Sequence, residues 1–294
     1  MAHSPDVSPR PAHDTAPWRL AKDIVPRPLI DLGRWVQHVA VYPRFRGVLQ
    51  TNDRWRNRFH GEQIYIIGNG PSLNQFGPER LSKQRVIVMN SFDRAAWKGD
   101  VEIIAHCLGE PYFSSSWSDP TETILGTASA SYWLHYSSLG RFADRIAGKN
   151  IHYVLPGRGA RLWGSRPIDL RKVTLTYQTT AQLAVMVALY MGFRRIILLG
   201  FDHDWLASPD YSRHFFSADR EPNDHLNRFS YYEILHLVTK MWENYYALRA
   251  TAQANGAEIV NMTNGSFLDV FPRVSPSVED GDSPRAGVRS CSNE

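Results

Sequence analysis

The chain has 294 residues, of which 43% are hydrophobic and 21% charged, and its net charge of +4 is only mildly basic. This length suits one large α/β domain or two small ones, and the small charge gives little support for a nucleic-acid partner. The sequence has no run of about 18 apolar residues, so we expect no membrane span, and its N-terminus has no apolar core of the kind that a secretory signal requires. We therefore expect a soluble, cytoplasmic protein that binds no nucleic acid.

The two ends of the chain differ from its middle. Residues 1–20 and 275–294 are rich in Pro, Ser, Ala or Gly, which predicts disordered tails. Between residues 21 and 60, apolar side chains at helical spacing predict a helix from Leu29 to Phe45. A basic stretch adjoins it, formed by Arg44, Arg46, Arg54, Arg56 and Arg58. We expect this extension to pack on the domain, and contact with a membrane surface or an acidic polymer is the alternative.

The first predicted strand and the turn after it organise the rest of the chain. The apolar run Ile64–Ile67 predicts a buried strand, which ends at the turn Gly68-Asn69-Gly70-Pro71-Ser72. We expect the two glycines to adopt unusual φ angles and to let a ligand approach the backbone. Pro71 is expected to begin a helix that Ser72 helps to cap. Free backbone N–H groups would then lie at the carboxyl edge of a sheet, where ligands bind in open α/β folds. A tight turn without a ligand is the alternative.

Strands and helices alternate along the remainder. Further strands are predicted at Arg85–Met89, Val101–Ala105, Ile151–Leu155, Arg195–Leu199 and Glu258–Asn261. Helices are predicted at Pro78–Leu81, within Thr174–Gly192 with Thr179 or Thr180 as its cap, and at Phe229–Asn255. We expect loops near the site between Leu108 and Leu139, and a mobile basic loop from Pro156 to Pro167.

This alternation predicts the fold class. It is typical of a Rossmann-like, doubly wound α/β domain with a mostly parallel sheet, here over residues 61–274. Residues 206–228 are polar and aromatic and are too long for a simple connector, so we expect a lid insertion there.

Polar side chains follow several of the predicted strands. The pairs are Asn69 with Ser72, Asn90 with Ser91, and Asp202 with His203, and Asn261 follows a fourth strand. Asn and Ser both donate and accept hydrogen bonds, so a converging set suits a base, a ribose or a phosphate. The alternative is that Asn occurs at strand ends because it tolerates turns.

Two further groups of residues can carry chemistry. Asp202 and Asp204 can hold Mg²⁺ or Mn²⁺ against a diphosphate, although Asp202 can instead close the strand or contact a ribose. In the insertion, His214 can take a proton from an acceptor hydroxyl, and Tyr211 or Arg213 can stabilise a leaving phosphate. The rivals for the base are His106, His203 and His225.

The motifs GNGPSL, MNSF and TTAQLAVMVALYMGFRRIILLGFD together resemble the bacterial sialyltransferases that make lipooligosaccharide caps. With GSFLDVFPRV they also resemble a group of domains from surface-polysaccharide loci that is labelled after the archaeal 6-hydroxymethylpterin diphosphokinases. The resemblance covers roughly residues 62–274 in scattered motifs. The diphosphokinase label fits less well, because the chain has HCLGEPY where that group carries an aspartate-rich segment.

The sialyltransferase resemblance implies a Rossmann-like fold, a donor sugar activated by CMP, and no required metal. It implies that the residues after the first, second and later strands bind the nucleotide, namely Gly68, Asn69, Gly70, Pro71, Ser72, Asn90, Ser91, Gly200 and Asp202. It also implies a catalytic base and a phosphate-binding tyrosine in the lid, where His214 and Tyr211 lie.

We therefore interpret the chain as a glycosyltransferase that moves a sugar, such as the nonulosonic acid sialic acid, from a CMP-activated donor to a bacterial glycan or glycolipid. One alternative is a Mg²⁺-dependent pyrophosphokinase of the 6-hydroxymethylpterin type that uses Asp202 and Asp204. Another is a non-catalytic nucleotide-binding scaffold in glycan assembly. A homo-oligomer and a peripheral position on the inner face of the membrane stay open.

Overall fold

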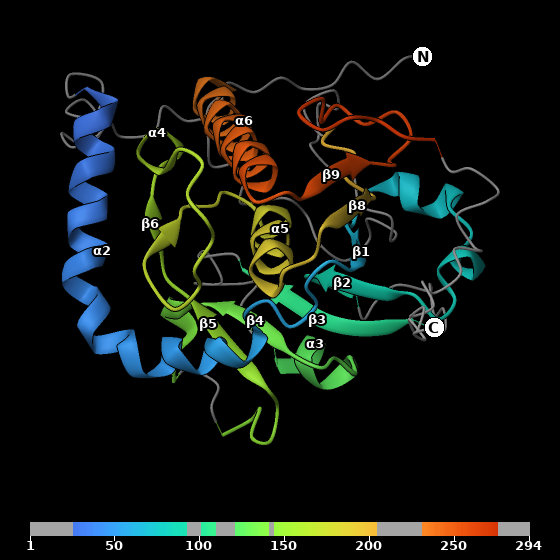
Figure 1. Ribbon diagram of the computed structural model, residues 1–294, viewed down its shortest axis with the longest axis horizontal. Helices are drawn as coiled ribbons and strands as arrows, with labels where there is room; N and C mark the ends of the chain where they lie inside the picture. Colours follow the sequence, from blue (N-terminus) through green and yellow to red (C-terminus); the bar gives the residue numbers. More distant parts are fainter. Residues whose placement is uncertain (1–25, 93–100, 110–120, 141–143, 205–230, 276–294) are drawn as a thin grey trace, which may run out of the picture.

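The computed structural model describes residues 26–92, 101–109, 121–140, 144–204 and 231–275. Its centre is a seven-stranded sheet in the order β5-β4-β3-β2-β1-β8-β9 (Figure 1). All neighbouring strands pair in parallel. The strands are β1 (Gln63–Ile67), β2 (Arg85–Met89), β3 (Glu102–Leu108), β4 (Tyr132–His135), β5 (Ile151–Val154), β8 (Arg195–Leu199) and β9 (Glu258–Asn261). The predicted α/β, Rossmann-like fold with a parallel sheet is confirmed.

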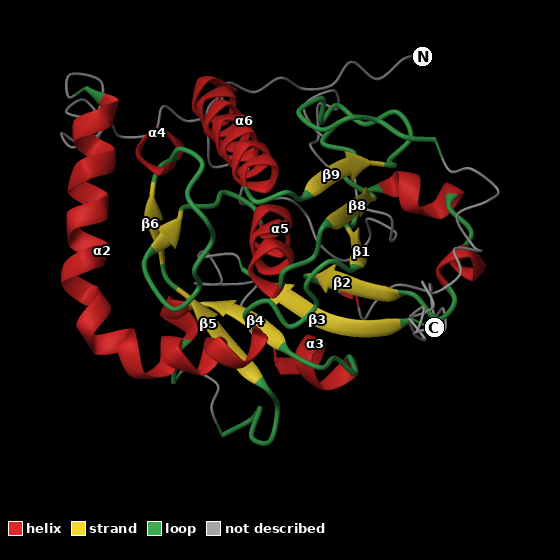
Figure 2. Cartoon of the chain, in the orientation of Figure 1, coloured by secondary structure: helices red, strands yellow, loops and turns green. Residues whose placement is uncertain are grey.

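Helices flank this sheet, as the cartoon coloured by secondary structure shows (Figure 2). The α-helices are α2 (Arg27–Gln50), α3 (Thr121–Gly126), α4 (Ala160–Trp163), α5 (Thr180–Met191) and α6 (Tyr231–Ala254). Short 3-10 helices span Thr51–Trp55, Pro71–Gln75, Pro78–Leu81 and Tyr136–Ser138. A separate two-stranded sheet pairs β6 (Pro156–Arg158) with β7 (Thr174–Leu175).

The strands separate two cores because successive side chains point to opposite faces of a sheet. On β1, Ile64 and Ile66 belong to the core that also contains α5 and α6. The intervening Tyr65 and Ile67 face the other core, which contains Leu73 and Leu81 from the short helices after β1. Both faces of the central strands are therefore covered, which explains their continuous apolar runs.

Helix α5 packs across β1, β2 and β3 and against α6. Eleven of its twelve residues are buried, as expected for a helix that is apolar all round. Thr179 is its cap, with a side chain that accepts a hydrogen bond from the Gln182 N–H group, and Gly192 ends it at φ 91°. The helix begins at Thr180 rather than at Thr174, because Thr174 and Leu175 pair with β6.

Two sequence predictions between residues 101 and 139 were wrong. Strand β3 continues through His106 to Leu108, since it pairs with both β2 and β4 along this length. Residues Tyr132–His135, which we expected in a loop, form β4 and are fully buried. This segment is rich in aromatic and polar residues and lacks the apolar run by which the other strands were predicted, so the sequence did not indicate a strand.

The segment from Pro156 to Pro167 is not the mobile basic loop that we expected. It forms β6 and α4, and Trp163 is buried with its indole N–H group donating to Thr251 Oγ1 at 3.1 Å. The segment is held in place by contacts with α6 and by pairing with β7. Its glycines and prolines made it resemble a loop in the sequence.

The N-terminal extension packs on the domain, as the sequence suggested. Helix α2 contacts β5, β6 and α4, and Leu49 near its end is fully buried (Figure 1). The arginines of the basic stretch lie on the solvent-exposed side. In the described part of the chain, no helix is both long and apolar enough to cross a membrane. Residues 1–20, nearly all of 275–294 and the insertion 206–228 lie outside the described residues.

Candidate active site

The sheet changes direction at its centre, between β1 and β8. From β1 the chain proceeds outward to β2, β3, β4 and β5, whereas β8 and β9 extend the sheet on the opposite side. Ile67 and Leu199, the last residues of β1 and β8, are register partners. The loops after these two strands therefore leave the sheet side by side at its carboxyl edge, which is the usual ligand position in such folds.

Gly68 and Gly70 allow these two loops to touch. A Cβ atom on Gly68 would lie 2.3 Å from the Gly200 carbonyl oxygen, and one on Gly70 would lie 1.7 Å from Asp202 Oδ2. Neither glycine has a positive φ, whereas Gly200 does, at 70°. The prediction that the first two adopt unusual φ angles was therefore wrong, and contact between the loops requires them instead.

Two of the N–H groups that we expected to be free in this turn form hydrogen bonds to the end of β8 and the residue after it. The Gly68 N–H donates to the Leu199 carbonyl at 2.7 Å, and the Gly70 N–H donates to the Gly200 carbonyl at 2.9 Å. Pro71 has no N–H group and begins a 3-10 helix without a side-chain cap. The Gly68 and Gly70 N–H groups thus hold the turn against the end of β8 and are not free to bind a phosphate.

Ser72 and Asp202 join the two loops by a pair of hydrogen bonds. The Ser72 N–H donates to Asp202 Oδ1 at 3.0 Å, and its hydroxyl donates to Oδ2 at 2.7 Å. Ser72 therefore does not cap a helix as predicted. Burial raises the pKa of the Asp202 carboxyl and the charge of Asp204 adds to this, while the bonds from Ser72 oppose it.

The raised pKa of Asp202 predicts a pH dependence. Because the folded protein binds this proton more tightly than the unfolded chain, the free energy of unfolding falls as the pH rises from the ordinary value of 3.8 through the raised pKa. Asp202→Asn keeps a similar shape without the ionisation, so its unfolding free energy should lack this fall. Urea denaturation of both proteins, from below pH 3.8 to neutrality, isolates the contribution. Identical slopes would show that the carboxyl is not perturbed.

Asn69 and Asn90 present buried oxygens to the site. Ile67 and Val88 are register partners on β1 and β2, so each Asn lies two residues beyond a paired position, on strands about 4.8 Å apart. The side-chain Oδ1 of each Asn is buried and has no hydrogen-bond partner among the described residues. Asn90 adopts φ 46° and the neighbouring Ser91 is buried. Both amide oxygens therefore lack the donors that buried acceptors normally have.

The start of α5 adds a residue that sequence reasoning treated only as a helix cap. A helix between parallel strands begins near their carboxyl edge. This holds here, because a Cβ on Gly109, just after β3, would touch Leu183 and Tyr177 at the start of α5. Thr180 is 1% exposed, and its hydroxyl has no hydrogen-bond partner in the described part of the chain. The doubled threonine before an apolar helix was the available signal.

Two of the rival histidines are engaged in structural contacts. His106 Nε2 donates to the Asn90 carbonyl at 2.7 Å, which supports the turn after β2. His203 Nε2 lies 2.9 Å from the Tyr245 hydroxyl of α6, and burial lowers the pKa of His203 to about 4. Tyr245 also contacts Thr179 at the start of α5. Both histidines thus position loops around the site, and the lowered pKa of His203 makes it a weak base near neutral pH.

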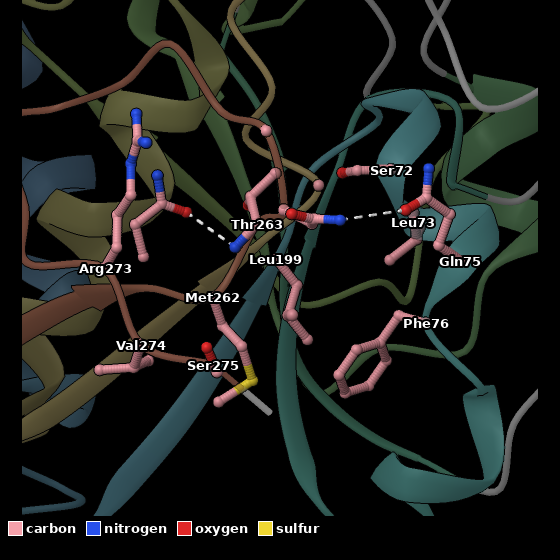
Figure 3. Close-up of a pocket in the computed structure, with 14 residues that line it drawn as sticks. Ser72, Leu73, Gln75, Phe76, Leu199, Met262, Thr263, Arg273, Val274 and Ser275 are labelled. Carbon is pink, nitrogen blue, oxygen red and sulfur yellow. Dashed lines mark hydrogen bonds between the residues drawn. The ribbon is translucent and has the colours of Figure 1, made fainter. Parts of the chain in front are cut away.

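A cavity of about 450 Å³ opens beside the joined loops. Figure 3 shows Ser72, Gln75 and Phe76 on one side of it and Thr263 and Arg273 on the other. Asn69 and Asn90 do not line this cavity.

Asn261 also lines the cavity, but its amide is used by the loop that follows β9. Its Nδ2 donates to Ser266 and Leu268, and its Oδ1 accepts from the Thr263 N–H. The expectation that Asn261 offers a free polar group was therefore wrong.

The remaining predicted residues divide into two sets. Asp204 is described and partly exposed, but the described residues contain no cluster of three or more His, Cys, Asp or Glu side chains that would hold a metal ion. His214, Tyr211 and Arg213, and the rival His225, lie outside the described residues. The structure thus brings together Asn69, Ser72, Asn90, Gly200 and Asp202 at one edge of the sheet.

No family model matches the sequence, and no curated protein matches it. Among solved structures, the chain is similar to the sialyltransferase CstII from Campylobacter jejuni in complex with cytidine-5'-monophosphate, at 16% identity and a TM-score of 0.46, over 76% of this chain and 88% of that one. It is also similar to the MAf glycosyltransferase from Magnetospirillum magneticum AMB-1, at 15% identity and a TM-score of 0.47, over 75% of this chain and 35% of that one.

Proposed function

We propose that the chain is a glycosyltransferase that takes its sugar from a CMP-activated donor, such as a CMP-linked nonulosonic acid, and transfers it to a bacterial surface glycan or glycolipid. The nucleotide would lie across the carboxyl ends of β1 and β2. The motif resemblance around Gly68–Leu73 and Met89–Phe92 suggests CMP, and the chemistry of the site supports it.

The observation that carries this proposal is the pair of unpartnered oxygens on Asn69 and Asn90. A buried acceptor without a donor costs about 1–3 kcal/mol, which a bound ligand recovers by donating to it. Ribose hydroxyls and the amino group of cytosine are such donors. A nucleoside therefore supplies the groups that these two side chains lack.

The start of α5 is suited to bind the phosphate of the nucleotide. The N-terminus of a helix carries partial positive charge, and the unpartnered hydroxyl of Thr180 lies there in a buried position. One hydroxyl and one helix end suit a single phosphate group. Asp202 takes part indirectly, because its bonds to Ser72 fix the loop that carries Asn69.

The transfer itself needs a base and a leaving phosphate. In the proposed reaction the acceptor hydroxyl attacks the anomeric carbon, a new C–O bond forms, and the bond between that carbon and the phosphate oxygen breaks through an oxocarbenium-like state. The hydroxyl proton passes to His214, and CMP departs with the bonding electrons. Tyr211 would donate a hydrogen bond to the departing phosphate.

The His214→Ala variant should lose transfer activity by about 100-fold or more while its affinity for CMP stays unchanged, since general-base catalysis contributes roughly 10²–10⁴-fold. Turnover of a CMP-sugar and equilibrium titration with CMP measure the two quantities separately. His225→Ala is the matched control, because it changes a histidine of the same segment. Unchanged turnover in His214→Ala would remove His214 from the mechanism.

A nucleotide titration tests the proposal as a whole. CMP should raise the melting temperature of the protein in EDTA, because a ligand that binds only the folded state stabilises it, and it should do so more than CDP, UDP, GDP or ATP at the same concentration. Stabilisation by ATP or UDP that requires Mg²⁺ would favour the metal-dependent alternative, and Asp204→Asn would then abolish it. Binding of CMP without turnover of any CMP-sugar would favour the scaffold.

A further inference from the structure

A second pocket, of about 360 Å³, lies between α2 and the segment from β6 to β7, and none of the residues of the candidate active site lines it. Figure 1 shows α2 alongside β6 and α4. Three cationic side chains line this pocket, namely Arg158, Arg166 and Lys172, against one carboxylate, Asp169. That carboxylate is already neutralised, because it accepts from Arg171 Nε at 2.9 Å and lies 3.5 Å from Lys172 Nζ.

Arg158 lines this pocket, and its Nε is a buried donor that has no acceptor among the described residues. The neighbouring Trp35 does not line the pocket, but its Nε1 is a second buried donor of this kind. The Arg158 guanidinium lies 5.4 Å from the centre of the Trp35 ring, so both N–H groups belong to one contact between β6 and α2. Burial lowers the pKa of Arg158, and the nearby charge of Arg166 lowers it further. Unpartnered donors and mutually repelling cations both call for an anion with several acceptor oxygens, such as a phosphate.

An exposed apolar stripe adjoins the pocket on α2. Leu29, Leu32, Val36 and Val39 follow a spacing of three and four residues, so they share one face of the helix. Their exposed fractions are 57%, 42%, 53% and 40%. Val39 belongs to the stripe and also lines the pocket. An occupant of both features must therefore have an anionic head and an apolar body.

We propose that α2 docks the protein on a membrane, with the phosphate of an anionic phospholipid in the Arg158 pocket and its acyl chains against the stripe of Leu29, Leu32, Val36 and Val39. Helices with an apolar face and basic neighbours bind such surfaces. A second copy of the chain fits less well. Helix α2 contains four arginines and one aspartate, so a symmetric pair would bring like charges together.

Co-sedimentation of the full chain with vesicles tests this docking. Vesicles of phosphatidylglycerol and phosphatidylcholine in equal amounts should bind the protein, whereas pure phosphatidylcholine should bind it weakly. Arg158→Gln and Arg166→Gln should each weaken binding to the anionic vesicles about fivefold. Arg161→Gln is the control, because Arg161 lies in the same segment but pairs with Glu243 and does not line the pocket, and it should change binding less than about twofold.

The apolar contact has an equally close control. Leu32 and Leu235 are both 42% exposed and lie on helices of 24 residues. Leu32→Ser should weaken vesicle binding about tenfold, since burying a leucine side chain contributes that order of free energy, and Leu235→Ser should not. If Arg158→Gln does not fold, the exposed Arg166 and Leu32 still decide the question.

Four outcomes would overturn the proposal. Equal loss in Arg158→Gln and Arg161→Gln, or equal binding to both kinds of vesicle, would remove the pocket from the interaction. Inorganic phosphate that raises the melting temperature without any vesicle binding would identify a free phosphate as the ligand. A dimer that Leu32→Ser dissociates, without vesicle binding, would assign the stripe to a second copy.

Discussion

Asn69→Leu should weaken CMP binding by about 10- to 100-fold and leave the free protein as stable as before or slightly more stable. Leucine keeps the branched shape of asparagine but removes the buried oxygen that has no partner among the described residues. The free protein no longer carries that unpaired acceptor, whereas the bound nucleotide is left with an unsatisfied donor, which costs about 1–3 kcal/mol of binding free energy. Titration with CMP and urea denaturation measure the two effects.

Asn261→Leu is the matched control for this prediction. Asn261 also lies at the end of a parallel strand, the edge strand β9, but its amide makes three hydrogen bonds within the loop that follows β9. Its replacement should lower the free energy of unfolding by about 2–4 kcal/mol. A large loss of stability in Asn69→Leu, like that in Asn261→Leu, would mean that Asn69 has a structural role and would contradict the proposed ligand contact.

Gly68→Ala should destabilise the protein by about 3 kcal/mol, because the added methyl group would lie 2.3 Å from the Gly200 carbonyl oxygen. That neighbour is backbone and cannot rotate away, so the loops after β1 and β8 must separate. The Ser72–Asp202 bonds and the position of Asn69 would change with them. We expect a melting temperature roughly 5–10 °C lower, measured by circular dichroism.

Gly47→Ala provides the opposite expectation from the same substitution. Gly47 is an exposed residue of α2, and a methyl group added to it would meet no atom within 4 Å. Alanine favours the helix over glycine, so this variant should be about 0.5–1 kcal/mol more stable. Equal stability of the two variants would contradict the close contact between the loops.

The central strands were predictable because they are buried on both faces. Continuous apolar runs ending at Gly or Asn located the central strands β1, β2 and β8 and also the edge strand β9, and the bounds of β2, β8 and β9 agreed with the structure. Strand β4 escaped detection because its burial depends on distant partners. Ser131, just before it, donates to the Ile104 carbonyl, and the Trp133 indole donates to Ser131. Because these polar groups form hydrogen bonds with partners that include a distant strand, the local sequence shows no pattern that is typical of a buried strand.

The sequence indicated which polar residues follow the central strands, but not the contacts that these residues make. The positions of Asn69 and Asn90 follow from where the strands end. The Ser72–Asp202 bonds join residues 130 positions apart, so no local pattern shows that Ser72 faces Asp202 rather than a helix end. Likewise, the two glycines of the turn are required by contact with Gly200 and Asp202 and not by their own φ angles. Thr180 lies near the site because α5 packs on the sheet with its start at the carboxyl edge, and this packing cannot be seen in the local sequence.

A crystal structure of the protein with CMP tests the central claim most directly, because it locates the nucleotide against named atoms. We predict hydrogen bonds from the nucleoside to Asn69 Oδ1 and Asn90 Oδ1, and the phosphate at the start of α5 beside the Thr180 hydroxyl. A nucleotide seated instead in the cavity between Gln75 and Arg273, with Asn69 and Asn90 still unpartnered, would contradict the proposed site.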